Sequence, residues 1–147
     1  MGKNKKPKKP KKQQKKSGIV VPELRDKEPE MLFSFKYLDT DGNSKFAIEK
    51  CDQNHLSNLL ARLRDLSKLK CMEFRTDRSK SLRSHRIEWE DTTEPRGFQL
   101  LDQQLRDLEP YQFSISQQER VHGFLLDDVF YVVWLDPNHE LYAWKAA

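Results

Sequence analysis

Two adjacent apolar runs near the C-terminus constrain the fold of this chain most strongly. Val121–Leu126 and Val129–Leu135 are rich in β-branched and aromatic residues, and only Asp127-Asp128 separates them. A short polar interruption between two such runs is typical of a tight β-hairpin. Asp136-Pro137-Asn138 follows, and proline has no N–H group with which to continue a strand ladder. We therefore expect a hairpin that ends there, with a polar segment directly beyond a buried strand.

Upstream, the pattern alternates between strand and helix. Met31–Tyr37 alternates as a strand does, and a turn cluster, Asp39–Ser44, precedes a second short alternation at Phe46 and Ile48, so Met31–Glu49 is predicted to be a hairpin. Asp52–Leu69 is predicted to be a helix, with Asp52 as its N-cap. Its expected buried stripe consists of leucines at helical spacing: Leu56, Leu59, Leu60, Leu63 and Leu66.

Three weaker elements follow before the C-terminal hairpin. Ser84–Glu90 alternates as a half-exposed strand, Phe98–Leu108 has leucines at helical spacing, and Tyr111–Ile115 is a further strand candidate. Together these elements predict an α+β fold, with an antiparallel sheet packed against one long and one short helix. We expect one such domain over residues 31–147, preceded by a disordered tail and linker over residues 1–30.

The basic charge of the chain is concentrated in that tail. Nine of the 27 basic residues lie within Lys3–Lys16, so the remainder has eighteen basic residues against 23 acidic ones, a net charge of −5. A lysine-rich segment of this kind either solubilises the protein or contacts nucleic-acid phosphates. The lysines considered for such contacts are Lys5, Lys6, Lys8, Lys9, Lys11 and Lys12.

One basic stretch also interrupts the acidic remainder of the chain. Arg62–Arg86 has nine basic residues and three acidic ones, a net charge of +6. Its first part continues the predicted helix, whose exposed face carries Arg62, Arg64 and Lys68. This face is either an ordinary solvated surface or a surface that binds an anionic partner such as RNA.

Metal and membrane motifs are incomplete. Asp39, Asp41 and Asn43 match the first ligands of a calcium loop, but Lys50 occupies the position of the bidentate glutamate. Cys51 and His55 lack two further clustered zinc ligands, so we expect no metal or cofactor, and we expect the cysteines to be free thiols. No apolar run approaches the ~20 residues of a membrane span, which predicts a cytoplasmic protein without a membrane partner.

The C-terminal segment resembles the closing strands of the RelE/ParE-like toxin superfamily. The resemblance covers Arg120–Phe124 and Phe130–Trp134, followed by His139-Glu140-Leu141-Tyr142, which is similar to the His-x-x-Tyr-like end of ribosome-dependent members. It covers about the last fifth of the chain, and the lysine-rich tail lies outside it. The resemblance implies a small α+β toxin that cleaves messenger RNA without a metal and has an antitoxin-like protein partner.

This resemblance implies that His139 and Tyr142 transfer protons and position the substrate. Local charge alone adds Arg83 and Arg86 as the cations that a phosphoryl-transfer site needs. The structural alternative is that His139 closes a turn and Tyr142 packs at the sheet edge. Two other functions also stay open: a non-catalytic module that binds nucleic acid or the ribosome, and a subunit that acts through a protein partner.

Overall fold

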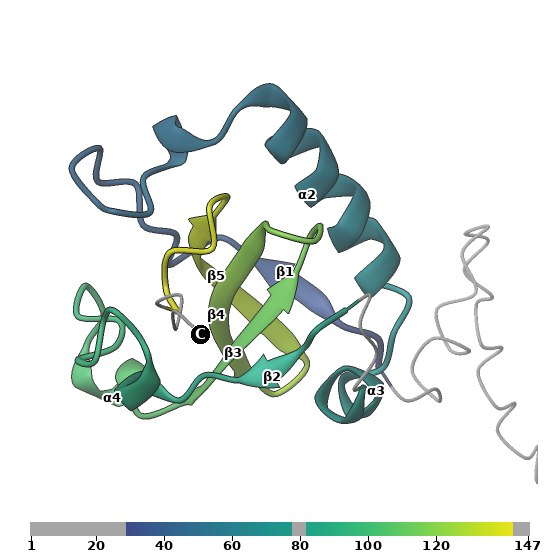
Figure 1. Cartoon of the computed structure of the whole chain (residues 1–147). Helices are drawn as coiled ribbons and strands as arrows, with labels where there is room; N and C mark the ends of the chain where they lie inside the picture. The colour runs from purple at the N-terminus through teal and green to yellow at the C-terminus, as the bar shows by residue number, and fades with distance from the viewer. Residues whose placement is uncertain (1–28, 78–81, 143–147) are drawn as a thin grey trace, which may run out of the picture.

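The computed structural model describes residues 29–77 and 82–142, so the lysines of the tail lie outside the described residues. Within these ranges a five-stranded, mostly antiparallel sheet has the order β1-β5-β4-β3-β2 (Figure 1). Its strands are β1 (Leu32–Ser34), β2 (His85–Arg86), β3 (Glu109–Ser114), β4 (Arg120–Leu126) and β5 (Val129–Asp136). With its helices, this sheet confirms the predicted α+β class.

The C-terminal hairpin forms the centre of the sheet, as its apolar runs predict. β4 and β5 pair from Leu126↔Val129 to Arg120↔Asp136, and Asp127 turns the chain with a φ of 53°. A β-bulge interrupts the register between His122 and Gly123. At Gly123 any Cβ would overlap the carbonyl oxygen of Tyr131 on β5, so only glycine allows the two strands to approach this closely.

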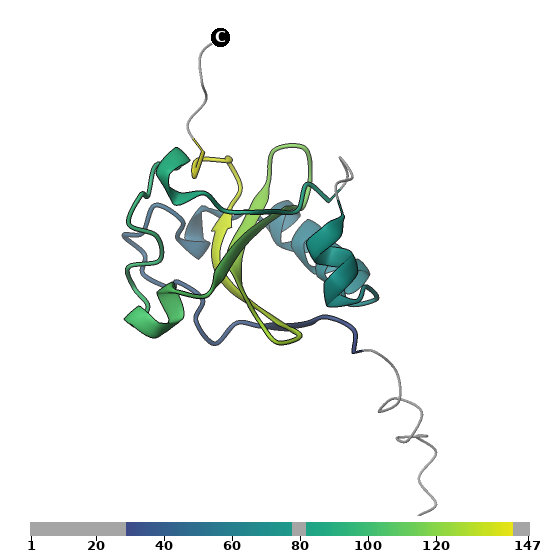
Figure 2. The same ribbon diagram turned by 90° about the horizontal axis from the view of Figure 1, so that it is seen from below.

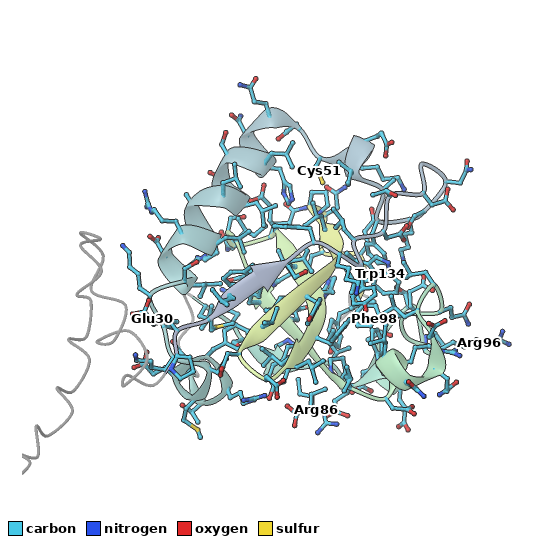
Figure 3. All side chains as sticks on the ribbon, turned by 180° about the vertical axis from the view of Figure 1, so that it is seen from behind. Glu30, Cys51, Arg86, Arg96, Phe98 and Trp134 are labelled. Carbon is cyan, nitrogen blue, oxygen red and sulfur yellow. The ribbon has the colours of Figure 1, made fainter. Side chains whose placement is uncertain are left out.

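Two different layers cover the faces of the sheet (Figure 2). Helices α2 (Gln53–Leu66) and α3 (Cys71–Thr76) cover one face, where Leu59, Leu63 and Phe74 join the first core cluster. The other face is covered by extended chain with the short helices η1 (Ile48–Lys50), η2 (Trp89–Asp91) and α4 (Gln103–Arg106). The second core cluster lies there, and Figure 3 shows Phe98 beside Trp134, with ring centroids 4.8 Å apart.

Helix α2 confirms the predicted cap and corrects the predicted stripe. The Asp52 side chain accepts a hydrogen bond from the backbone N–H of His55 at 2.7 Å. Leu59, Leu63 and Leu66 are buried, but Leu60 is 65% exposed and Leu56 36%. Five leucines spread over a wider arc than one sheet face covers, and His55 occupies the buried position at the start of the helix instead.

The predicted N-terminal hairpin, Met31–Glu49, is wrong. β1 has only three residues and runs parallel to β5, so its partner lies about a hundred positions further along the chain. Asp39 closes its own turn by accepting hydrogen bonds from Asp41 N and Ser44 Oγ. Phe46 then packs on Trp134 at 4.7 Å, because the chain crosses to the second face of the sheet instead of pairing with β1.

The strand predicted over Tyr111–Ile115 is present as β3, whereas the two other remaining elements are shorter than predicted. The strand expected over Ser84–Glu90 contains only the two residues of β2, and Trp89–Asp91 is a 3-10 helix. The helix expected over Phe98–Leu108 forms only at α4, and α3 was not predicted at all. These segments depend on long-range contacts more than on local periodicity. No helix in the part of the chain that the structure describes is long and apolar enough to cross a membrane.

Candidate functional site

A pocket of about 300 Å³ lies over the β2 side of the sheet and brings together residues from distant segments. It is lined by Arg83, His85, Gln112, Arg120, His139 and Tyr142. Three of the four residues proposed from the sequence as catalytic are therefore in one place: His139, Tyr142 and Arg83. Arg86 is not among the lining residues.

Strand alternation explains the difference between His85 and Arg86. His85 pairs with Gln112, and Gln112 pairs in turn with His122, which contacts Phe46 on the second face of the sheet. Arg86 pairs with Tyr111, which packs against the first core cluster on the opposite face. Successive side chains of a strand point to opposite faces. Arg86 is therefore exposed at the periphery (Figure 3), and the arginines that line the pocket are Arg83 and Arg120.

The segment after β5 carries His139 and Tyr142 back over the sheet. His139 has a φ of 55°, in the left-handed region, which turns the chain sharply. Tyr142 forms an isolated β-bridge with Thr92, and Thr93 N donates to Leu141 O at 2.7 Å. This segment is therefore held both to β5 and to the loop after η2.

Tyr142 is held so that its hydroxyl proton can point into the pocket. The backbone N–H of Glu88 donates to the Tyr142 hydroxyl oxygen at 3.2 Å. Partial burial raises the pKa of Tyr142 above its ordinary value; the hydrogen bond from Glu88 N–H acts in the opposite direction, and the Glu88 and Asp91 carboxylates add to the rise. The phenol therefore stays protonated at neutral pH and can donate a hydrogen bond to a ligand.

His139 has the opposite character. Partial burial lowers the pKa of His139, and the positive charge of Arg120 lowers it further, while Asp136 acts in the other direction. The imidazole is therefore neutral at pH 7 and can accept a proton. Its ring centroid lies 6.5 Å from that of Tyr142, so a proton acceptor and a proton donor lie close together in the lining of the pocket.

His85 and Gln112 form the side wall. His85 Nδ1 lies 2.9 Å from the carbonyl oxygen of Arg86, which can only accept, so Nδ1 carries the proton. In the neutral ring, His85 Nε2 then accepts from the amide of Gln112, also at 2.9 Å. Both ring nitrogens are occupied in this way, and the ring packs against Tyr142 at 5.6 Å. We assign His85 to shaping the site and not to proton transfer.

Arg120 supplies a buried positive charge. Its residue is only 2% exposed, and one terminal nitrogen donates to the carbonyls of Ser116 and Glu119. Its Nε has no hydrogen-bond partner among the described residues. Burial lowers the pKa of Arg120, and nearby Arg83 adds to the effect, but a guanidinium keeps its proton at neutral pH. Two cations therefore face one pocket, an arrangement that favours an anionic ligand.

Sequence reasoning missed His85, Gln112 and Arg120. Arg120 directly precedes the apolar run Val121–Leu126, so the sequence placed it at the start of a predicted strand. His85 and Gln112 lie 27 positions apart, and only the β2–β3 pairing brings them together. Arg83 approaches Arg120 because the preceding residue, Leu82, accepts a hydrogen bond from Ser114 N at 2.8 Å.

The helical part of the basic stretch lies away from the pocket. Arg62 is half-buried and donates to the carbonyl of Ile115 at 3.2 Å, which ties α2 to the turn before β4. The side chains of Arg64 and Lys68 are 70% and 72% exposed and flank Asp65. These two exposed cations form a surface separate from the pocket-lining residues.

The described residues contain no group of three or more His, Cys, Asp or Glu side chains that could hold a metal. No disulfide joins Cys51 and Cys71, and the Cys71 thiol donates to the carbonyl oxygen of Asp127 at 3.8 Å. Burial, with the carboxylates of Asp52 and Glu119, raises the pKa of Cys51 to about 11, so its thiol is a poor nucleophile at neutral pH. Comparisons with protein-family models, curated proteins and solved structures gave no match for this chain.

Proposed function

We propose that the chain is a metal-independent endoribonuclease of the RelE-like kind, which cleaves messenger RNA in the cytoplasm. The observation that supports the proposal is the pocket that gathers His139, Tyr142, Arg83 and Arg120. It combines a neutral imidazole that can accept a proton, a protonated phenol that can donate one and two guanidiniums that can stabilise phosphoryl charge, and these are the roles that cleavage of a phosphodiester by an internal hydroxyl needs.

The proposed step is a transesterification within the RNA. The 2′-oxygen of one nucleotide attacks the adjacent phosphorus, and the bond from phosphorus to the 5′-oxygen of the next nucleotide breaks. The 2′-hydroxyl proton goes to His139, and the departing 5′-oxygen receives a proton from the Tyr142 hydroxyl. The products are a 2′,3′-cyclic phosphate and a 5′-hydroxyl, so the step needs no further reactant.

The two arginines have a different role in this proposal. Negative charge develops on the non-bridging oxygens of the phosphate in the transition state, and Arg83 and Arg120 lie where they can stabilise it. Because Arg120 is almost fully buried, its charge is little screened by water. DNA lacks the 2′-hydroxyl, so the same pocket leaves DNA uncut.

The test is RNA cleavage in a translating extract and with purified RNA, with EDTA added only to the reactions on purified RNA. We expect His139→Ala to abolish product formation and wild-type cleavage to continue in EDTA. Since neutral His139 is the acceptor, the rate should rise with pH through a pKa below 6.5 and then level off. Equal RNA survival with wild type and His139→Ala would refute the proposal, as would cleavage that EDTA stops.

Two arginines three positions apart provide a matched control. Arg83 lines the pocket and Arg86 does not. We expect Arg83→Ala to lower the cleavage rate at least tenfold and Arg86→Ala to leave it unchanged. If neither wild type nor these variants cleave RNA, while deletion of residues 1–16 lowers RNA affinity and its salt dependence, a non-catalytic binding module replaces the enzyme.

A further inference from the structure

A buried histidine and carboxylate lie beneath the segment that carries His139 and Tyr142. The side chains of His122 on β4 and Asp136 on β5 are 0% and 1% exposed, and His122 Nε2 lies 2.9 Å from Asp136 Oδ2. Neither residue lines the pocket. Any influence that they have on a ligand in the pocket passes through the residues that line it.

The Asp136 carboxylate holds the segment after β5 at two consecutive backbone positions. Its Oδ1 accepts from Glu140 N at 2.8 Å, and its Oδ2 accepts from Leu141 N at 3.0 Å. Glu140 and Leu141 are the two residues between His139 and Tyr142. This carboxylate therefore helps to position both candidate proton-transfer side chains, together with the bonds from Glu88 N and Thr93 N, and His122 hydrogen-bonds to that carboxylate.

The charge states follow from the surroundings. Burial alone raises the pKa of Asp136, but hydrogen bonds from His122 and from the Glu140 and Leu141 backbone outweigh it and hold the pKa below its ordinary value. Asp136 is therefore an ionised acceptor. Burial lowers the pKa of His122, and the effect of Asp136 offsets this only in part, so the ring is neutral with its proton on Nε2.

We propose that Asp136 and His122 are positioning residues for the pocket, fixing His139 and Tyr142 through the backbone of Glu140 and Leu141. This inference rests on the proposed ribonuclease function for its kinetic consequence. The arginines reach the pocket from other segments, Arg83 from the chain before β2 and Arg120 from the start of β4. Loss of the buried pair should therefore lower kcat and leave the KM for RNA nearly unchanged.

Asp136→Asn is the first test. An amide oxygen can accept from one backbone N–H, but the amide nitrogen cannot accept from the other, so the segment loses one of its two attachments. A displacement of the reacting groups by about 1 Å costs up to ~100-fold in rate. We expect kcat to fall tenfold to 100-fold, with KM within about threefold of wild type.

His122 offers a conservative and a disruptive variant. Gln places an amide N–H near the position of Nε2 and can still donate to Asp136, whereas Leu cannot. We expect His122→Gln to retain kcat within about threefold and His122→Leu to lose as much as Asp136→Asn. If Gln and Leu reduce kcat equally, the positioning role is refuted.

Asp39→Asn is the matched control for general loss of stability. Asp39 is also a buried carboxylate that closes a turn, accepting from Asp41 N, Ser44 Oγ and Trp134 Nε1, but it does not line the pocket. At a temperature where circular dichroism shows all variants folded, Asp39→Asn should keep wild-type kcat. A fall in kcat equal to that of Asp136→Asn would overturn the inference.

A readout without RNA separates this inference from the proposed function. Hydrogen exchange of the Glu140 and Leu141 amides, followed by NMR, should accelerate at least tenfold in Asp136→Asn and His122→Leu but not in Asp39→Asn, and the His139 ring signals should shift. If wild type does not cleave RNA while these changes occur, the ribonuclease proposal fails and the holding role stands. Unchanged amide exchange refutes the holding role whatever the activity.

Discussion

Unfolding at acidic pH provides the most direct test of whether burial keeps His122 neutral in the folded protein. Burial lowers the pKa of His122 from its ordinary value of 6.5, so the unfolded chain binds a proton at a pH where the folded chain does not. His122 therefore leaves the free energy of unfolding unchanged above about pH 6.5 and lowers it as the pH falls towards the pKa of the folded state. The expected direction is a fall in the free energy of unfolding between pH 7.5 and pH 4.5.

The size of this loss follows from proton linkage. For a histidine with an unfolded pKa of 6.5 that stays neutral in the folded state, the loss is RT ln(1 + 10^(6.5−pH)). That amounts to about 1.4 kcal/mol at pH 5.5 and about 2.7 kcal/mol at pH 4.5 as upper limits. His139, whose pKa is also lowered, adds a smaller loss in the same direction. Asp136 contributes only at lower pH, because its folded pKa lies below 3.8.

The groups around His122 determine whether the free energy of unfolding falls or rises on acidification. Asp136 favours the protonated ring, while His85 and Arg120 disfavour it together with burial. Urea unfolding at half-unit pH steps, followed by circular dichroism, measures the slope for wild type and His122→Gln. The glutamine variant should remove most of the slope, whatever its stability at pH 7.5. A wild-type protein that becomes more stable as the pH falls to 5.5 would refute the argument, because it would show that the Asp136 charge outweighs burial.

Three further substitutions test the fold and the site. Gly123→Ala should destabilise the protein by about 3 kcal/mol in urea unfolding, because its Cβ meets the backbone of β5. Leu59→Ala should cost about 3 kcal/mol and Leu60→Ala less than ~0.5 kcal/mol, since Leu59 is buried and Leu60 is exposed. Tyr142→Phe should lower the RNA cleavage rate about 100-fold without loss of helical signal, because it removes only the hydroxyl proton donor.

Each of these has a clear contrary result. Wild-type stability of Gly123→Ala would mean that the strands are further apart at the bulge than described. Equal costs for Leu59→Ala and Leu60→Ala would mean that α2 presents a different face to the sheet. An unchanged rate for Tyr142→Phe would exclude its hydroxyl from the reaction.

The sequence was sufficient to predict those elements whose formation depends on residues close together in the chain. The hairpin of β4 and β5 forms as predicted because two apolar runs with strand periodicity flank a two-residue turn. The cap of α2 forms as predicted because Asp52 needs only the N–H three residues later. The end of β5 before Pro137 likewise depends on a backbone donor that proline lacks.

The sequence identified His139, Tyr142 and Arg83 as candidates, but it did not predict that they lie in one pocket; the proposed function only required it. Their residue types and spacing are visible in the chain, whereas their approach to Arg83 depends on how the segment before β2 runs beside β3. The same alternation that turns His85 inward turns Arg86 away, and the exact limits of a two-residue strand cannot be read from periodicity.

The sequence by itself determined the α+β class, the central hairpin, the start of the long helix and the polar segment after β5. Only the tertiary structure decided that β1 runs parallel to β5, that Leu60 is exposed, and that Arg120, His85 and Gln112 complete the pocket. The physical reason is that a side-chain pattern specifies which face of an element is apolar, but not which distant element covers it. Pairing partners and convergent polar groups depend on contacts between residues far apart in the chain, and they exist only once the sheet has formed.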